Sequence, residues 1–257
     1  MEVFMLEIIH TTVFANASGG GNPCPVVLES DVVTTEQMQS MTKDFQYESV
    51  FISKSHKKDC DFHLRYFVPT HEMEMCVHAT IAASTVLIIK NCIQKHDIFY
   101  ETILGKIKVR WKKQKDQIKI QVWRFLPKKS PLAPSKEEIC FALGISKDDL
   151  LDYPIESYST SRYKLMIPIK NRMILDQIVP DFLALQNLCE QYMTTGFYPF
   201  TFETDSNHTS FYARQFPKNS GYPEDAATGV AASALGAYII EHKRIEKVSG
   251  FTVIKDS

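Results

Sequence analysis

The chain has 257 residues, of which 44% are hydrophobic, and a formal net charge of -1 at pH 7. This length and apolar content can bury a full core, which excludes a disordered chain and allows either one large domain or two of ordinary size. Acidic and basic residues are interspersed, so there is neither the basic stripe of a nucleic-acid-binding protein nor an acidic tail, and we expect no nucleic-acid partner.

No membrane or export signal stands out in the sequence. The first thirty residues lack a basic segment followed by an apolar run, and no stretch reaches the length needed to cross a bilayer. The six cysteines are scattered without a C-x-x-C pair, as expected of reduced thiols. We therefore expect a cytoplasmic protein with no membrane partner.

Short β-rich runs alternate with helical stretches, a pattern typical of α/β or α+β proteins. The runs expected to form strands are 25–28, 49–53, 62–67, 118–123, 163–169 and 210–216. A polar segment at 112–117 predicts a hairpin turn. The segment 127–134, rich in proline and lysine, predicts a boundary between two domains, 1–126 and 127–257.

Two surface helices are indicated by their capping residues. Thr34-x-x-Gln37 and Ser135-x-x-Glu138 are capping boxes, whose side chains satisfy the free amides of a first helical turn. Gly144 suits the C-terminal cap of the second of these helices.

Two other helices are expected to be central, one in each half. The segments 79–89 and 230–240 are apolar or small on every face, which a helix tolerates only when it is enclosed. At one offset of 149 positions, an Arg-x-Phe motif (65–67 and 214–216) and a segment with Ala-Ala-Ser (81–84 and 230–233) each occur twice. Alanine-rich helices can resemble one another by chance, but the second motif at the same offset favours an internal duplication.

A duplicated chain predicts a site between its halves. Each half would be a strand, a loop and the N-terminus of a buried helix, and the two loops would face each other. Amides without partners and the positive end of the helix dipole favour an anion at such a place. We therefore expect a small carboxylate-bearing substrate in a cleft between the halves.

Both loops carry groups that can do acid–base chemistry. The loop at 72–80 contains two glutamates, Cys76 and His78, and the loop at 222–229 contains Asp225 and Thr228. Burial beside a helix start can tune the pKa of such groups. Taken singly, Asp225 and Thr228 are better explained as helix N-caps, and His78 as a core histidine.

Five motifs occur together in a recognisable order. They are Gly-Asn-Pro at 21–23, Glu-Ser-Val-Phe at 48–51, Arg-Tyr-Phe-x-Pro-Thr-x-Glu at 65–72, Cys-Val-His-Ala-Thr at 76–80 and Glu-Asp-Ala-Ala-Thr-Gly at 224–229. Over nearly the whole chain, from about Phe14 to near Ile240, the sequence resembles the PhzF-like phenazine biosynthesis family. The resemblance implies an α+β fold of the diaminopimelate epimerase type, with two similar halves that each wrap a sheet around a central helix. It also implies a cofactor-independent isomerase that forms a homodimer.

The resemblance also implies roles for individual residues. Glu48 corresponds to the catalytic glutamate, which takes a proton from carbon and returns one elsewhere on the substrate; its alternative is a solvated charge at a strand end. Gly21 is expected to shape the backbone near the ligand. The residues implied to bind substrate are His78, Asp225, Gly229, Asn22, Ala79 and Thr228.

Two departures from the family pattern leave the substrate open. Val77 stands where the family usually has glycine, and Val230 stands where it usually has serine. Loss of a serine hydroxyl indicates a different substrate, or a protein that binds a ligand without turning it over. A cysteine-dependent epimerase or racemase is the weaker alternative, because Cys76 could supply one thiol but no cysteine follows Cys189 to supply the second.

Metal and nucleotide sites are not expected. Cys76 and His78 with Glu72 or Glu74 are suitable ligand types, but a pair at i and i+2 without a distant partner does not make a structural zinc site. The glycine run at 19–21 is not followed by the lysine of a phosphate-binding loop. The sequence thus predicts no cofactor and no metal.

Overall fold

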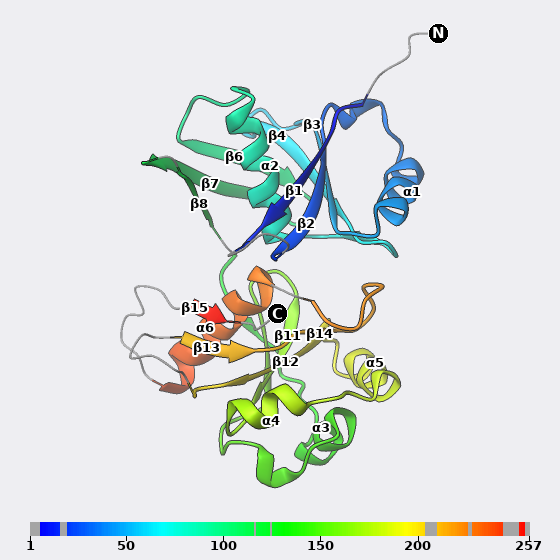
Figure 1. Ribbon diagram of the computed structural model, residues 1–257, viewed down its shortest axis with the longest axis vertical. Helices are drawn as coiled ribbons and strands as arrows, with labels where there is room; N and C mark the ends of the chain where they lie inside the picture. The colour runs from blue at the N-terminus through cyan, green and yellow to red at the C-terminus, as the bar shows by residue number, and fades with distance from the viewer. Residues whose placement is uncertain are drawn as a thin grey trace. The chain divides into compact units, whose positions relative to one another are not determined.

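The computed structural model describes residues 6–15, 20–115, 117–123, 125–203, 210–225, 228–243 and 252–254 (Figure 1). The chain divides into two compact units, Met1–Arg124 and Phe125–Ser257. Each unit combines a β-sheet with α-helices, so the fold is of the α+β class. Over the described residues, no helix is long and apolar enough to cross a membrane.

One sheet forms the framework of the first unit. Its described strands are β1 (Ile8–Val13), β2 (Asn22–Val27), β3 (Ser49–Lys54), β4 (Phe62–Phe67), β5 (Glu72–Met73), β6 (Asp97–Thr102), β7 (Gly105–Gln114) and β8 (Gln117–Val122). They pair in the order β1-β2-β3-β4-β6-β7-β8, with β5 on β4. The β2–β3 and β4–β6 pairs are parallel and the others are antiparallel. Gln114 pairs with Gln117, which confirms the hairpin predicted at 112–117.

Helix α2 (Val77–Ile89) is enclosed by this sheet. It contacts β1, β2, β3 and β8, which include the strands at both ends of the pairing order. Ten of its thirteen residues are buried, as its apolar and small residues predict. The fully buried alanines, such as Ala83, let the strands approach the helix closely. The sheet therefore wraps around α2, while η1 (Ser30–Val32) and α1 (Thr35–Phe45) precede β3 in the chain.

The second unit is a sheet with helices on both faces. Its described strands are β9 (Lys128–Lys129), β10 (Glu156–Ser159), β11 (Tyr163–Pro168), β12 (Gly196–Thr201), β13 (Ser210–Ala213), β14 (Phe216–Pro217) and β15 (Thr252–Ile254). They pair in the order β15-β13-β12-β11-β10-β9, with β14 on β12. Its described helices are α3 (Lys136–Leu143), η2 (Lys147–Asp149), α4 (Arg172–Gln177), α5 (Phe182–Gln191) and α6 (Gly229–Lys243).

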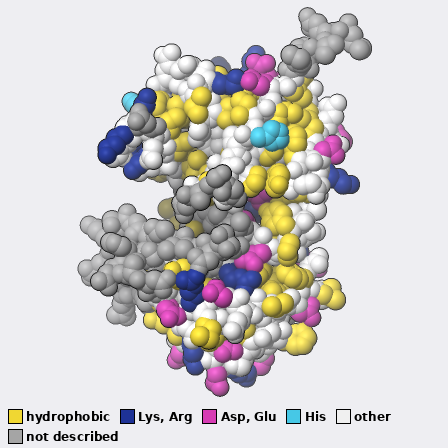
Figure 2. All heavy atoms as spheres, viewed as in Figure 1, with side chains coloured by type: hydrophobic (Ala, Val, Ile, Leu, Met, Phe, Trp, Pro, Cys, Tyr) yellow, Lys and Arg dark blue, Asp and Glu magenta, His cyan; other side chains and the backbone are white. Residues whose placement is uncertain are grey.

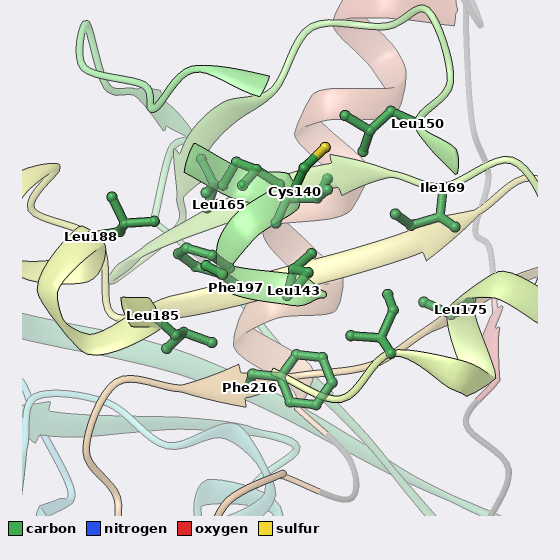
Figure 3. Close-up of a cluster of buried hydrophobic side chains, with 14 of the residues drawn as sticks. Cys140, Leu143, Leu150, Leu165, Ile169, Leu175, Leu185, Leu188, Phe197 and Phe216 are labelled. Atoms are coloured by element: carbon green, nitrogen blue, oxygen red, sulfur yellow. The ribbon is translucent and has the colours of Figure 1, made fainter. Parts of the chain in front are cut away.

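Alternation along the strands divides the second unit into two apolar cores. Successive strand residues point to opposite faces, so Leu165 and Phe197 pack with α3, α4 and α5 (Figure 3). Met166 and Tyr198 pack with α6 on the other face. Burying a large apolar side chain such as Phe197 contributes about 1.5–3 kcal/mol. Both faces of this sheet are therefore covered by helices.

The capping residues predicted from the sequence are confirmed. The Thr34 hydroxyl accepts the amide of Gln37, and the Gln37 side chain accepts the amide of Thr34. Ser135 and Glu138 make the same exchange at the start of α3, which ends at Gly144 with a φ of 66°. Each such side-chain cap contributes about 1 kcal/mol.

The duplicated Arg-x-Phe motif has the same structure in both units. Arg65 makes a two-point ion pair with Glu72, at 2.7 and 2.6 Å, and lies 5.2 Å from the centre of the ring two residues on. Arg214 pairs in the same way with Glu224, at 3.1 and 2.8 Å, and lies 4.8 Å from its own ring. The hydroxyl of Ser84 bonds to the carbonyl four residues back in α2, and a serine 149 positions later does so in α6. The arginines and serines at equivalent positions thus make similar contacts, although Glu72 follows its arginine by seven residues and Glu224 by ten.

Surface charge is balanced locally as well as in total. In Figure 2, Lys and Arg side chains lie among Asp and Glu side chains over the visible face of the second unit. Exposed ion pairs of this unit include Lys147–Glu137 and Lys136–Asp152. Exposed pairs of this kind contribute at most about 1 kcal/mol each, so they serve solubility more than stability.

Candidate active site

Glu48, Cys76 and His78 form a cluster at the start of α2. Glu48 directly precedes β3, Cys76 is the N-cap of α2, and His78 is the second residue of that helix. Oε2 of Glu48 lies 3.1 Å from Nε2 of His78 and 3.2 Å from Sγ of Cys76. Sγ of Cys76 lies 3.4 Å from Nδ1 of His78. Two of the predicted site residues, Glu48 and His78, are therefore in contact, with Cys76 as a third member.

Strand pairing explains why residues 28 positions apart meet. β3 pairs with β4 so that Ser49 lies opposite Phe67, and β5 folds back on β4 so that Phe67 also lies opposite Glu72. The start of β3 and the start of β5 are therefore both aligned with one residue of β4. Because α2 begins only a few residues after β5, its first turn lies beside Glu48.

Burial controls the protonation of Cys76. The side chains of His78 and Glu48 are only 5% and 12% exposed, and Cys76 is buried beside them. Burial raises the pKa of the Cys76 thiol well above its ordinary value, the carboxylate of Glu48 and the neighbouring Cys24 raise it further, and the amide of Ala79 opposes them. At neutral pH, Cys76 is therefore a thiol whose hydrogen can be donated to Glu48.

Buried hydroxyls fix the first turn of α2. The Thr80 hydroxyl lies 2.6 Å from the carbonyl of Cys76 and 2.8 Å from the hydroxyl of Tyr66 on β4. One turn later, the Ser84 hydroxyl lies 2.9 Å from that of Tyr100 on β6. Ala79, predicted to bind substrate, is fully buried in this turn and leaves no side chain beyond Cβ. The first turns of α2 are thus held by hydroxyl contacts to two neighbouring strands, β4 and β6.

Gly21 and Asn22 lie where strand β2 begins. Gly21 has a φ of 85°, and a Cβ there would lie 2.6 Å from the carbonyl oxygen of Val13 and 2.8 Å from the amide of Ala15. Only glycine fits such a close approach at a positive φ. Asn22 is buried and pairs with Val13 as the first residue of β2. The glycine therefore shapes the backbone that carries Asn22.

The remaining predicted residues lie in the second unit, at the start of α6. The Thr228 hydroxyl accepts the amide of Ala231 at 3.4 Å, so Thr228 acts as the N-cap of α6, and Gly229 is the first helical residue. The amide of Asp225 donates to the carbonyl of Gln215 at 3.0 Å. Burial raises the pKa of Tyr198, and the charge of Asp225 raises it further. The contact of these residues with a substrate stays a prediction.

The possible metal donors beside Cys76 and His78 are not the ones that the sequence suggested. The two-point ion pair of Glu72 with Arg65 occupies a carboxylate that the spacing had suggested as a ligand. The third donor comes instead from Glu48, and one ligand atom each from Glu48, Cys76 and His78 lies within 4.8 Å of the others. Among the described residues, a second such group consists of Glu156, Glu241 and His242. Sequence spacing pointed neither to Glu48 nor to the second group, because each group joins residues from separate elements.

Comparison with known proteins agrees with the motifs. A family model described as phenazine biosynthesis-like protein (PhzC-PhzF) matches residues 11–255. The chain is 31% identical over 245 residues to the uncharacterized isomerase YfhB of Bacillus subtilis, an alignment that covers 94% of this chain and 83% of that protein. It is also 31% identical over 244 residues to the uncharacterized isomerase YddE of Escherichia coli K12, covering 92% of this chain and 80% of that protein.

Solved structures show the same relationship. The Bacillus anthracis phenazine biosynthesis protein of the PhzF family aligns with a TM-score of 0.82 and 25% identity, over 94% of this chain and 82% of that one. A probable proline racemase from Agrobacterium radiobacter, at 9% identity over 91% of this chain and 78% of that one, shares the fold alone, with a TM-score of 0.61. The chain therefore belongs to the phenazine biosynthesis-like family, and like its curated relatives it is an isomerase.

Proposed function

We propose that this protein shifts a proton on a small carboxylate-bearing substrate without a cofactor, and that Glu48 is the general acid and base. The observation that supports the proposal is the contact of Oε2 of Glu48 with both Nε2 of His78 and Sγ of Cys76 at the start of α2. A carboxylate held by two hydrogen-bonding partners and only 12% exposed is positioned to exchange protons with one face of a bound molecule.

A carboxylate base fits this site better than a thiolate base. The raised pKa of Cys76 keeps its sulfur protonated at neutral pH, so the thiol is a donor and Glu48 is the acceptor. An epimerase of the two-thiol type also needs a second cysteine opposite the first, and no cysteine follows Cys189 in the sequence. A single carboxylate that removes and returns a proton on one face suits an isomerase.

His78 is proposed as a positioning residue for Glu48. Its Nε2 faces Oε2 of the carboxylate at 3.1 Å, and its ring is 5% exposed, so it has little freedom to move away. A hydrogen bond to one carboxylate oxygen fixes the orientation of the other. Loss of this contact would displace the base rather than remove it.

The substrate carboxylate is proposed to bind near the N-terminus of α2. The first amides of a helix have no intrahelical acceptor, and the helix dipole adds roughly half a positive charge at that end. Val77 and Ala79 lie in this first turn. In the second unit, the start of α6 at Thr228 and Gly229 is proposed to make the corresponding contact, with Asp225 and Asn22 as further substrate-binding residues.

The proposal is tested by proton exchange. The protein is incubated with a panel of small carboxylates in deuterated water, and label entering carbon is followed by NMR. We expect exchange that falls about 10²–10⁴-fold in Glu48→Gln, the usual contribution of a general acid–base group. Glu36→Gln, an exposed change on α1, is the matched control and should exchange normally.

Three results would contradict the proposal. Exchange that persists in Glu48→Gln but disappears in Cys76→Ala would assign the chemistry to the thiol. Equal exchange in Glu48→Gln, Cys76→Ala and the unsubstituted protein would show that the cluster takes no part in the reaction. Tight binding of a carboxylate with no exchange on any substrate of the panel would favour a protein that holds its ligand without turning it over.

A further inference from the structure

We propose that Glu48, Cys76 and His78 bind a divalent transition-metal ion of the zinc type, and that the bound ion blocks the proton shift. The binding site stands on geometry alone, whereas the block rests on the proposed function of Glu48. The donors are Oε2 of Glu48, Sγ of Cys76 and Nε2 of His78, one atom from each side chain. Their separations are 3.2 Å for oxygen to sulfur, 3.1 Å for oxygen to nitrogen and 3.9 Å for sulfur to nitrogen.

These separations match one face of a zinc tetrahedron. Zinc binds sulfur at about 2.3 Å and nitrogen or oxygen at about 2.0–2.1 Å, so tetrahedral donors lie about 3.5 Å apart for sulfur and oxygen, 3.3 Å for nitrogen and oxygen and 3.6 Å for sulfur and nitrogen. The observed separations differ from these ideals by about 0.2–0.3 Å. Small side-chain rotations are therefore enough to place all three atoms on one ion.

The donor types select the class of metal. One thiolate, one imidazole and one carboxylate suit zinc and cobalt, whereas magnesium and calcium prefer oxygen alone. As the sulfur–metal bond forms, the thiol proton of Cys76 leaves to solvent, and the resulting thiolate and the carboxylate of Glu48 balance the charge of the ion. The start of α2 repels a cation but stabilises the thiolate that binds it. Three protein donors leave a fourth position for water or a substrate oxygen.

The second group of candidate donors does not compete as well. Glu156, Glu241 and His242 are also close together, but the ammonium of Lys129 lies 2.6 Å from Glu156 and 3.2 Å from Glu241. A resident positive charge already balances these carboxylates, and a metal would have to displace it. His242→Gln is therefore a matched control, because it removes a histidine from the other candidate group.

A bound ion would stop the proton shift directly. Oε2 of Glu48 is both a metal donor and the oxygen that faces His78 and Cys76. Coordination of Oε2 withdraws electron density from the whole carboxylate, Oε1 included, and so removes the basicity that would accept the substrate proton. Occupation of the site and catalysis by Glu48 therefore exclude each other.

Cobalt titration tests the site in the full chain. Cys60→Ser and Cys92→Ser remove the half-buried and the exposed thiol that would bind metal at the surface. Added Co²⁺ should give a thiolate-to-cobalt charge-transfer band that saturates at about one ion per chain and is displaced by Zn²⁺. Cys76→Ser should abolish the band, and His78→Gln and Glu48→Gln should each weaken binding about 10–100-fold, while His242→Gln should leave it unchanged. A band that survives Cys76→Ser, or is lost in His242→Gln, would overturn the assignment.

Two further measurements keep the outcomes distinct. X-ray absorption at the zinc edge of the Cys60→Ser, Cys92→Ser protein should show one sulfur and two nitrogen or oxygen protein ligands, and absence of a sulfur ligand would refute the site even if a variant fails to fold. In the deuterium-exchange assay, Zn²⁺ should abolish exchange and a chelator should restore it. If cobalt binds as expected but no substrate exchanges deuterium, the proposed function is refuted and the metal site still stands. If Glu48-dependent deuterium exchange is unchanged at saturating Zn²⁺, the proposed inhibition by the bound ion is refuted.

Discussion

The guanidinium of Arg214 donates two hydrogen bonds to the carboxylate of Glu224, from Nε at 3.1 Å and from Nη2 at 2.8 Å. Both side chains are only about one-fifth exposed. The remaining nitrogen, Nη1, donates to three carbonyls at the end of α4, those of Leu175, Asp176 and Ile178. One side chain therefore ties the end of α4 to the segment that carries Asp225.

We expect Arg214→Met to lower the free energy of unfolding of the second unit by about 2–3 kcal/mol, because a charged hydrogen-bond donor is lost and its acceptors remain partly buried. Denaturant unfolding followed by circular dichroism measures the change. Lys147→Met, which breaks the exposed pair with Glu137, should change stability by less than about 0.5 kcal/mol. Equal effects of the two substitutions would show that the Arg214 contacts contribute no more than an exposed ion pair.

His78→Gln is expected to lower kcat about 100-fold with a smaller change in KM, because a displaced catalytic group costs rate more than binding. An amide of similar reach can still donate to Glu48, but its flexible side chain does not hold the contact to Oε2 as rigidly as the imidazole ring. Steady-state kinetics on a substrate found by the exchange assay gives both constants. If only KM rises, His78 binds substrate and does not position the base.

Cys76 is expected to resist alkylation in the folded protein. Its pKa is raised above the ordinary value, so the reactive thiolate fraction near pH 8 is small, and the sulfur is also buried. Cys92 is exposed and should react first with iodoacetamide, as peptide mapping by mass spectrometry can follow. Labelling of Cys76 at the rate of Cys92 would indicate a thiolate in the resting site and would favour thiol chemistry.

Asp97 is expected to contribute to acid sensitivity. Hydrogen bonds from Arg110 and then Lys108 hold the pKa of Asp97 well below its ordinary value of 3.8. A carboxyl with a lowered folded-state pKa stabilises the fold above its unfolded pKa, and that stability is lost as the pH falls. Asp97→Asn should therefore show a flatter decline in unfolding midpoint between about pH 4 and pH 2 than the unsubstituted protein. Asp44→Asn, an exposed change on α1, is the control, and an equally flat decline in that variant would contradict the assignment.

Local features of the sequence were enough to predict much of the fold. Capping pairs act within one helical turn, so Thr34 with Gln37 and Ser135 with Glu138 could be identified from spacing alone. Helix α2 could be recognised because an apolar pattern on every face is explained by enclosure. The same pattern at 230–240 only partly predicted α6, which packs against one face of its sheet and leaves Ile240 53% exposed. The repeated Arg-x-Phe motif added the internal duplication.

The chemistry of the site was less accessible from the sequence. Family resemblance indicated Glu48 and His78, but it did not reveal that Cys76 contacts both of them. That contact depends on the register of β3, β4 and β5, which brings residues 28 positions apart together and leaves no periodic signal in the chain. The raised pKa of Cys76 likewise follows from burial, which only the assembled unit supplies. The placement of the substrate between the two halves stays a prediction.

Closure of the sheet around α2 has a consequence for the order of assembly. The helix touches β1, among the earliest described residues, and β8, which ends at Val122. When His78 has just been synthesised, the strand β8 that covers one side of α2 does not yet exist. Nearly the whole first unit must therefore be synthesised before α2 is sheltered from water, which makes an early stop within β7 or β8 more damaging to the cluster than its distance along the chain suggests.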